Sequence, residues 1–184
     1  MDNPITDIRR VVSELCEPSD SKLAAVEKYF TDDAVFVNPL FNSPQAAGRE
    51  GVKAAYKMLR VLSYGQRFDF HAVGFDRITT DGTGTERQKM FIDVTERLKL
   101  AFVPLPERLN PTFQIRFLSR IDLVKGDDDL WRIEKQEDNL PTDFASTGLH
   151  FFPFDRQISN AVKWAAGSAT LLVGGTLSKF NLFT

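Results

Sequence analysis

The sequence is poor in the side chains that most often bind metals. It contains one cysteine, Cys16, and two histidines, His71 and His150, among 184 residues. One cysteine cannot form an internal disulfide or a thiolate cluster, and two distant histidines lack the spacing of a zinc site. Nucleotide-binding glycine motifs, H-E-x-x-H and G-x-S-x-G are also missing. We therefore expect no metal ion and no nucleotide cofactor.

Long runs of one charge sign are absent as well. The formal net charge is −2, and lysine and arginine do not cluster, so nucleic acid is not an expected partner. The first ten residues, MDNPITDIRR, contain acids and no apolar segment, unlike a secretory signal. Together with the lone cysteine, these features favour a cytoplasmic protein, or one at a cytosol-facing membrane surface.

What the sequence does contain is the pattern of one α+β domain. Residues 89–103, 112–125 and 130–137 read as three strands joined by a proline-marked turn and a tight polar turn. Alternate residues of the middle strand are apolar, as in an antiparallel strand with one buried face. These apolar residues are Ile115, Phe117, Ile121 and Leu123. Other apolar elements must cover this face.

The segments before this meander can supply the cover. Apolar residues at helical spacing predict one helix that begins at Pro4, a second within 19–30 and a third over 50–62. Alternation predicts a short strand over 34–40 and a longer one over 67–75. The expected order is therefore helix, helix, short strand, helix and four longer strands.

Three passages carry a family resemblance. KYFTDDAVFVNPL (28–40) reads as the passage from the second helix to the first strand, GREGVKAAYKML (48–59) as the opening of the third helix, and LWRIEKQEDNL (130–140) as the last strand. In their order and spacing, residues 5–145 resemble the nuclear transport factor 2-like superfamily, which includes SnoaL-like cyclases and ketosteroid isomerases. The WRIEKQED ending and the long tail resemble the fungal SigF-like branch of that superfamily.

The resemblance implies a cone-shaped α+β barrel over residues 1–147, in which a curved antiparallel sheet with a mixed edge wraps around the N-terminal helices. It also implies an apolar pocket at the wide end, which would bind a small hydrophobic or lipid-like molecule. The residues expected to line this pocket are Tyr29, Phe30, Phe36, Tyr56, Leu59, Phe91, Phe117 and Trp131. A homodimer is a further expectation, because members of the superfamily often pair through the sheet face.

Known isomerases of the superfamily place a carboxylate base and a hydroxyl or protonated-acid donor inside the cone. By this resemblance, the catalytic candidates are His71, Asp93 and Asp122. His71 interrupts a strand-like stretch and titrates near neutral pH. The alternative for each residue is a place on the solvated face of its strand. Asp93, for example, shares a strand face with Arg97.

An apolar C-terminal extension, residues 148–184, follows the predicted barrel. From Trp164 to Ser178 it has no charged residue, but these 15 residues are fewer than the about 20 that span a bilayer. Three alternatives are open: a helix folded onto the barrel or a dimer partner, an interfacial membrane anchor, and a full span with Lys163 and Lys179 on opposite sides. The expected contact residues are Trp164, Leu171, Leu172, Val173, Leu177 and Phe180.

Three functions are compatible with these features. The first, which we favour, is non-enzymatic binding of a small hydrophobic or lipid-like molecule at a membrane surface; it predicts that no acid–base pair meets in the cavity. The second is a cofactor-independent isomerase, cyclase or hydrolase of polyketide- or steroid-like substrates, with the catalytic candidates inside the cone. The third is a dimeric scaffold with a continuous apolar patch outside the barrel.

Overall fold

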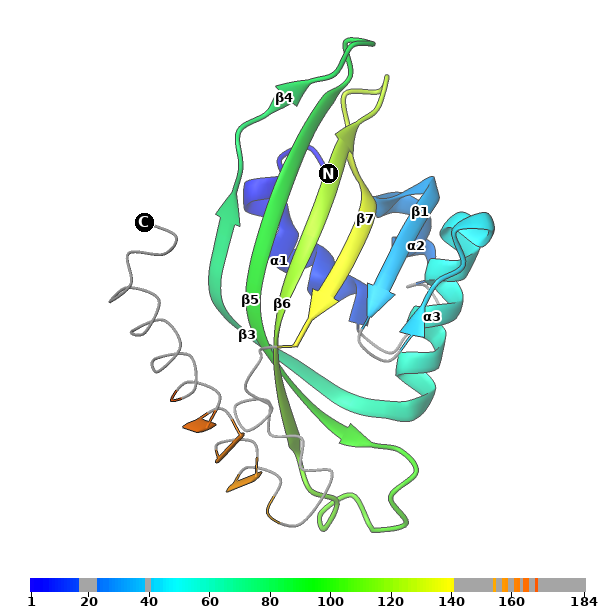
Figure 1. Cartoon of the computed structure of the whole chain (residues 1–184). Helices are drawn as coiled ribbons and strands as arrows, with labels where there is room; N and C mark the ends of the chain where they lie inside the picture. Colours follow the sequence, from blue (N-terminus) through cyan, green and yellow to red (C-terminus); the bar gives the residue numbers. More distant parts are fainter. Residues whose placement is uncertain are drawn as a thin grey trace, which may run out of the picture.

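A curved sheet forms the centre of the molecule (Figure 1). The computed structural model describes residues 1–16, 23–38 and 41–140 and, beyond them, residues 154, 157–158, 161–162, 164–165 and 168. Six strands follow one another in the order β2-β1-β7-β6-β5-β3, and a short seventh strand, β4, pairs with the start of β5. The strands are β1 (Phe30–Asn38), β2 (Phe41–Asn42), β3 (Ser63–Phe75), β4 (Thr79–Thr80), β5 (Glu86–Leu100), β6 (Phe113–Lys125) and β7 (Trp131–Asn139).

Neighbouring strands are antiparallel with one exception. The strands β1 and β7, which are far apart in the sequence, run parallel to each other. The sheet is strongly curved but not closed, with β2 and β3 at its two edges. The predicted α+β class, the curved sheet with a mixed edge and the predicted meander are therefore confirmed, as an open cone.

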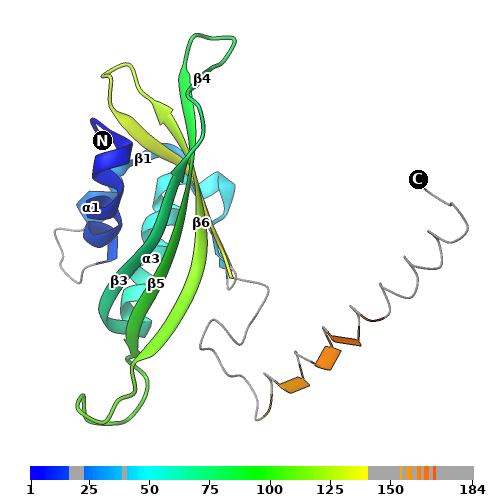
Figure 2. The same ribbon diagram turned by 90° about the vertical axis from the view of Figure 1, so that its left-hand side faces the viewer.

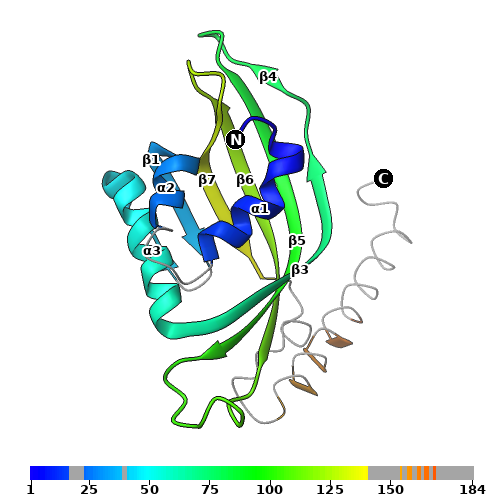
Figure 3. The same ribbon diagram turned by 180° about the vertical axis from the view of Figure 1, so that it is seen from behind.

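Three helices cover one face of the sheet. They are α1 (Pro4–Cys16), α2 (Leu23–Tyr29) and α3 (Gly48–Leu62), and a short 3-10 helix, η2 (Gln45–Ala47), leads into α3. Figure 3 shows α1 crossing the sheet with α2 and α3 beside it, and Figure 2 shows the helices on the same side of the sheet. None of these three helices lies on the opposite face (Figure 2).

The first helix illustrates why these residues fold as they do. Its buried residues are spaced at three or four positions, so that they form one stripe facing the sheet. These residues are Pro4, Ile8, Val11 and Leu15. The side-chain oxygen of Asn3 accepts a hydrogen bond of 3.0 Å from the backbone N–H of Ile5, which satisfies one free donor at the start of the helix. The predicted amphipathic helix is thus confirmed.

A bulge in β7 decides which of its side chains face the helices. Leu123 of β6 pairs with Ile133, whereas its neighbour Asp122 pairs with Lys135, so that Glu134 is an extra residue in β7. An extra residue reverses the alternation of faces along the rest of a strand. The two buried residues beyond the bulge are consequently Gln136 and Asp138.

The described part of the C-terminal extension exposes apolar side chains. Trp164 is 76% exposed, and Phe154, Ile158 and Val162 are exposed as well. Among the described residues, no helix is both long enough and apolar enough to cross a membrane. The other predicted contact residues, Leu171, Leu172, Val173, Leu177 and Phe180, lie outside the described residues.

Candidate functional site

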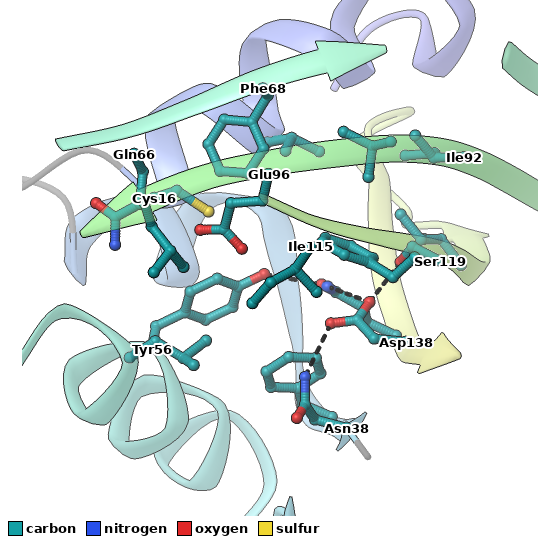
Figure 4. Close-up of a pocket in the computed structure, with 18 of the residues that line it drawn as sticks. Cys16, Asn38, Tyr56, Gln66, Phe68, Ile92, Glu96, Ile115, Ser119 and Asp138 are labelled. Atoms are coloured by element: carbon teal, nitrogen blue, oxygen red, sulfur yellow. Dashed lines mark hydrogen bonds between the residues drawn. The ribbon is translucent and has the colours of Figure 1, made fainter. Parts of the chain in front are cut away.

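A cavity of about 400 Å³ lies between the helices and the inner face of the sheet (Figure 4). Its volume falls in the range of about 300–1,000 Å³ that is typical of small-molecule sites. The helices α1 and α3 contribute one wall, and β1, β3, β5, β6 and β7 contribute the others. The apolar lining includes Phe36, Leu59, Phe68, Val94, Ile115 and Phe117. A cavity of this kind favours a ligand that is itself largely apolar.

Asp138 is the centre of a hydrogen-bond network on the β7 wall. Its Oδ1 accepts hydrogen bonds of 2.7 Å from the Ser119 hydroxyl and 3.1 Å from the Gln136 amide, and its Oδ2 accepts one of 3.4 Å from the Asn38 amide. Ser119 is the direct partner of Asp138 in the pairing of β6 with β7. Burial raises the pKa of Asp138, and the three donors act against this shift.

Tyr56 of α3 extends the same network. Its hydroxyl donates a hydrogen bond of 2.9 Å to the side-chain oxygen of Gln136. Its ring is stacked on Phe36, with ring centres 5.4 Å apart and planes 9° apart. Burial raises the pKa of Tyr56 well above its usual range, so the hydroxyl stays protonated and acts as a donor.

Glu96 of β5 is the second carboxyl group of the cavity. Its side chain projects from the sheet toward the space between Cys16 and the Tyr56 hydroxyl (Figure 4). Among the described residues, no hydrogen bond or ion pair reaches this carboxyl group. Burial, followed by the negative charge of Asp138, raises the pKa of Glu96 from 4.5 to about 7. At neutral pH, Glu96 is therefore divided between its protonated and ionised forms.

Cys16, at the end of α1, also lines the cavity. Burial, and then the charges of Glu96 and Asp138, raise the pKa of its thiol well above the usual value. A thiol with a raised pKa is a poor nucleophile at neutral pH, because the thiolate is the reactive form. Cys16 therefore acts here as a small apolar wall residue. The described residues contain no cluster of three or more metal-binding side chains.

The structure brings four of the eight expected pocket residues to the cavity. They are Phe36, Tyr56, Leu59 and Phe117. Three others, Tyr29, Phe30 and Trp131, are buried in the core away from the cavity. The hydroxyl of Tyr29 donates to Glu14 at 2.8 Å and accepts from Arg10, so it points away from the inside of the cone. Phe91 lies on the outer face, 41% exposed, because it alternates with the inward-facing Met90 and Ile92.

The three catalytic candidates are not brought together in the cavity. Asp93 lies on the outer face, where Arg116 donates two hydrogen bonds to its carboxylate at 2.9 and 2.6 Å. Asp122 also faces outward, and its Oδ1 lies 3.3 Å from Nε of Arg120. The hydrogen bond to Arg116 holds the pKa of Asp93 below its usual value, which is unlike a buried general base.

His71 lies on the same outer surface, on the edge strand β3. Phe70 pairs with Val94 and Ala72 pairs with Asp93, so that His71 is an extra residue in β3. Its ring Nε2 lies 2.8 Å from the Thr95 hydroxyl, and its side chain is exposed. Both this bulge and the one in β7 are of the kind that curves such sheets.

Comparison with known families decides the classification of the chain. The sequence matches the SigF NTF2-like domain over residues 1–182, which is nearly its whole length and includes the C-terminal extension. The chain belongs to this family. The predicted resemblance to the nuclear transport factor 2-like superfamily is thereby confirmed. No curated protein sequence matches the chain significantly.

Solved structures agree with this assignment at the level of the fold. A nuclear transport factor 2-like superfamily protein from Salmonella enterica is 13% identical with a TM-score of 0.58, covering 76% of this chain and 90% of that one. A type 2 hexachlorocyclohexane dehydrochlorinase is 15% identical with a TM-score of 0.55, covering 81% and 93%. A periplasmic fragment of TraM is 12% identical with a TM-score of 0.50, covering 74% and 95%. At these identities the likeness shows the fold alone.

Sequence reasoning missed the two cavity carboxyls of this SigF NTF2-like domain. A signal for Glu96 was present, since it is in phase with the apolar residues Ile92, Val94 and Leu98 on one face of β5. Simple alternation from Ile133, by contrast, puts Lys135 and Glu137 inside. The bulge at Glu134 reverses this order and brings Asp138 inside. An acidic residue at an inward-facing strand position therefore indicates a cavity carboxyl group, but the positions of the β-bulges must be known to decide which residues face inward.

Proposed function

We propose that the protein binds a small, largely apolar molecule in the cavity between α1, α3 and the sheet. The observation that carries this proposal is the 400 Å³ space itself, which is enclosed mainly by aromatic and aliphatic side chains. A space of this size in a protein interior costs stability when it is empty, because its walls lose van der Waals contacts. Such a cavity is accordingly more typical of a binding site than of a packed core.

The test uses a neutral fluorescent probe, N-phenyl-1-naphthylamine, whose emission rises in apolar surroundings. Wild type should give saturable binding with one site. The substitution Ile115→Trp fills the cavity from β6 and should weaken binding at least tenfold. Leu118→Trp, on the outer face of the same strand, is the matched control and should leave binding unchanged. Equal probe affinity for wild type and a folded Ile115→Trp variant would contradict cavity binding.

A second candidate function is cofactor-independent proton transfer on the bound molecule, and the observation that favours it is Glu96. A carboxyl group with a pKa of about 7 in an apolar cavity can both accept and donate a proton near neutral pH. Asp138 accepts three hydrogen bonds, which stabilise its own negative charge in the same cavity. The favoured sequence hypothesis predicted that no acid–base pair meets in the cavity, whereas two carboxyl groups line it, and this supports the alternative.

A generic substrate tests this second function without knowledge of the natural one. In 5-nitrobenzisoxazole, a base that removes the ring C–H proton breaks the N–O bond and releases a coloured cyanophenolate. Ionised Glu96 should accelerate this reaction, with a rate that rises through pH 7. Glu96→Gln should abolish the acceleration, and Asp93→Asn, an outer-face acid of the same strand, should retain it. Equal rates for Glu96→Gln and wild type would exclude Glu96 as the base.

Peripheral membrane association is a further part of the proposal. Exposed apolar residues support it at two places, namely Ile158, Val162 and Trp164 in the extension and Phe102, Leu105 and Leu109 in the loop between β5 and β6. Full-length protein should float with vesicles of phosphatidylcholine and phosphatidylserine. Replacing Ile158, Val162 and Trp164 together by serine should reduce flotation, and equal flotation would exclude the extension as the anchor.

A further inference from the structure

The hydroxyl and amide donors that line the cavity already donate to protein acceptors. The hydroxyls of Tyr56 and Ser119 donate to Gln136 and Asp138, respectively. The amide groups of Gln136 and Asn38 both donate to Asp138. A ligand that needs a hydrogen-bond donor from either hydroxyl would have to break an existing bond, because each hydroxyl has a single proton. Breaking a buried hydrogen bond costs about 1–3 kcal/mol, and this cost lowers the affinity of the cavity for such a ligand.

Gln66 adds an acceptor to the wall, and its orientation is fixed by its neighbours. The Ser63 hydroxyl donates its single proton to the Leu59 carbonyl oxygen at 2.7 Å. Ser63 must therefore accept at its other contact, the 2.8 Å bond with Gln66, so that Gln66 presents its NH₂ group there. The Oε1 atom of Gln66 is then buried without a hydrogen-bond partner among the described residues.

Two acceptors of the cavity wall, Gln66 Oε1 and the Glu96 carboxylate, thus have no hydrogen-bond partner among the described residues. They lie on neighbouring strands, since Glu96 pairs with Phe68, two residues after Gln66. Both residues line the same cavity. A buried acceptor without a donor is unfavourable, and a ligand that carries N–H donors would relieve it.

We propose that the natural ligand is a small hydrophobic amine, bound as its ammonium ion by Glu96 with Gln66 Oε1 as a second acceptor. This inference rests on the cavity-binding function proposed above and names its ligand class. An ammonium ion carries three donors and no acceptor, so it can donate to both of these acceptors. The aromatic side chains of Phe36, Phe68 and Phe117 also line the cavity, and an aromatic ring can attract a cation that lies over its face.

The charged and titratable groups that face Glu96 favour a cation as well. Asp138 on β7 places a second negative charge in the cavity, and this charge acts on Glu96. Cys16 on α1 and Tyr56 on α3 both have raised pKa values and remain neutral. Among the described lining residues the cation is Arg60 on α3, and its Nη2 donates to the Leu15 carbonyl oxygen at 2.8 Å. An ammonium ion beside Glu96 would offset the repulsion between the two carboxylates.

Binding should consequently depend on pH in a definite direction. The ammonium ion needs ionised Glu96, and the pKa of this group is about 7 in the free protein. Affinity should be highest at about pH 8 and fall as Glu96 becomes protonated below 7, toward tenfold for each pH unit. It should fall again above about pH 10, where an alkylamine loses its proton.

The experiment is calorimetric titration of the full chain at pH 8 with 4-phenylbutylamine and with 4-phenylbutanol, a neutral compound of the same size. The amine should bind at least tenfold more tightly than the alcohol. Glu96→Gln should weaken amine binding at least tenfold and leave alcohol binding unchanged or tighter. Asp93→Asn, which removes an acid from the outer face of the same strand, should change neither.

The outcomes separate this inference from the function on which it rests. If the alcohol binds at the cavity as tightly as the amine, or Glu96→Gln binds the amine like wild type, the amine is excluded while cavity binding stands. If neither compound binds and N-phenyl-1-naphthylamine does not bind either, both proposals are overturned. Circular dichroism confirms that each variant is folded, and Gln66→Ala, which removes the second acceptor without touching Glu96, should weaken only the amine.

Discussion

Glu96 and Asp138 line the same cavity, and the negative charge of Asp138 adds to burial in raising the pKa of Glu96 to about 7. The two groups are not equivalent. Asp138 accepts hydrogen bonds from three side chains, whereas Glu96 has none among the described residues. A carboxylate that is fully hydrogen-bonded can keep its charge, and one without partners is the group that gains a proton. Asp138 is therefore the group that stays charged, and Glu96 is the group that takes up or releases a proton.

Removing the charge of Asp138 should lower the pKa of Glu96. In Asp138→Asn the electrostatic contribution disappears and only burial remains, so the pKa moves from about 7 toward 4.5. Carbon-13 NMR titration of the Glu96 carboxyl measures this directly. Asp122→Asn, on the outer face, is the matched control and should have no effect. An unchanged pKa in Asp138→Asn would show that burial alone accounts for the shift.

The stability of the protein should depend on pH through Glu96. Because the pKa in the folded state is raised above 4.5, the folded state holds the proton more tightly than the unfolded state does. The stability from this group is fully present below pH 4.5 and is lost as the pH rises through about 7. The loss amounts to as much as about 3 kcal/mol, at about 1.4 kcal/mol per pKa unit.

Glu96→Gln removes this titration and provides the measurement. In urea unfolding, the free energy of unfolding of the variant minus that of wild type should increase as the pH rises from 4 to 8. Asp93→Asn is a control of opposite character, because the pKa of Asp93 is lowered by Arg116. Its stabilising contribution is present above the unfolded pKa and is lost only as the pH falls through the folded value. A difference between Glu96→Gln and wild type that is constant from pH 4 to pH 8 would contradict the raised pKa.

The sequence allowed the fold to be predicted because most of its patterns are local. Helical spacing in α1 and alternation in β6 identified both elements and their buried faces. The short strands β2 and β4 were not predicted, since two residues cannot show alternation. Phe30, interpreted as the inward end of the second helix, is instead the first residue of β1.

The cavity was harder to predict because its polar residues depend on strand pairing. The extra residue Glu134 brings Asp138 inside, and no local pattern around 130–137 marks that bulge. The candidates His71, Asp93 and Asp122 were chosen by residue type. The type of a residue does not determine on which face of the sheet its side chain lies. All three lie on the outer face, in contact with Thr95, Arg116 and Arg120, respectively. A register error of one residue moves a side chain to the opposite face.

Removing the hydroxyl of Tyr56 should destabilise the protein. In Tyr56→Phe, Gln136 loses the donor to its side-chain oxygen in a buried place, which costs about 1–3 kcal/mol. The stacking on Phe36 is retained, so the effect reports the hydrogen bond. Tyr29→Phe provides a comparison, because the Tyr29 hydroxyl bonds Glu14 in a partly exposed place and should cost less. Chemical denaturation measures the free energy of unfolding of both variants. Equal decreases would contradict a larger contribution from the buried hydrogen bond of Tyr56.

Gly48, at the start of α3, should tolerate no side chain. Its φ of +51° is unfavourable for residues with a Cβ atom, and a Cβ there would overlap the backbone carbonyl oxygen of Asp32 on β1. Because backbone atoms cannot move aside easily, Gly48→Ala should lower the free energy of unfolding by at least about 2 kcal/mol.

Gly74→Ala is the matched control for this position. Gly74 lies in β3 with open space around its Cβ position and without a positive φ, so alanine there should leave stability unchanged or raise it by up to about 1 kcal/mol. Urea denaturation of both variants separates the local strain at Gly48 from the general effect of replacing glycine. Since α3 carries Tyr56 and Leu59 to the cavity wall, a shift of α3 in Gly48→Ala should also weaken binding of N-phenyl-1-naphthylamine. Wild-type stability in Gly48→Ala would mean that the β1–α3 approach is looser than the structure shows.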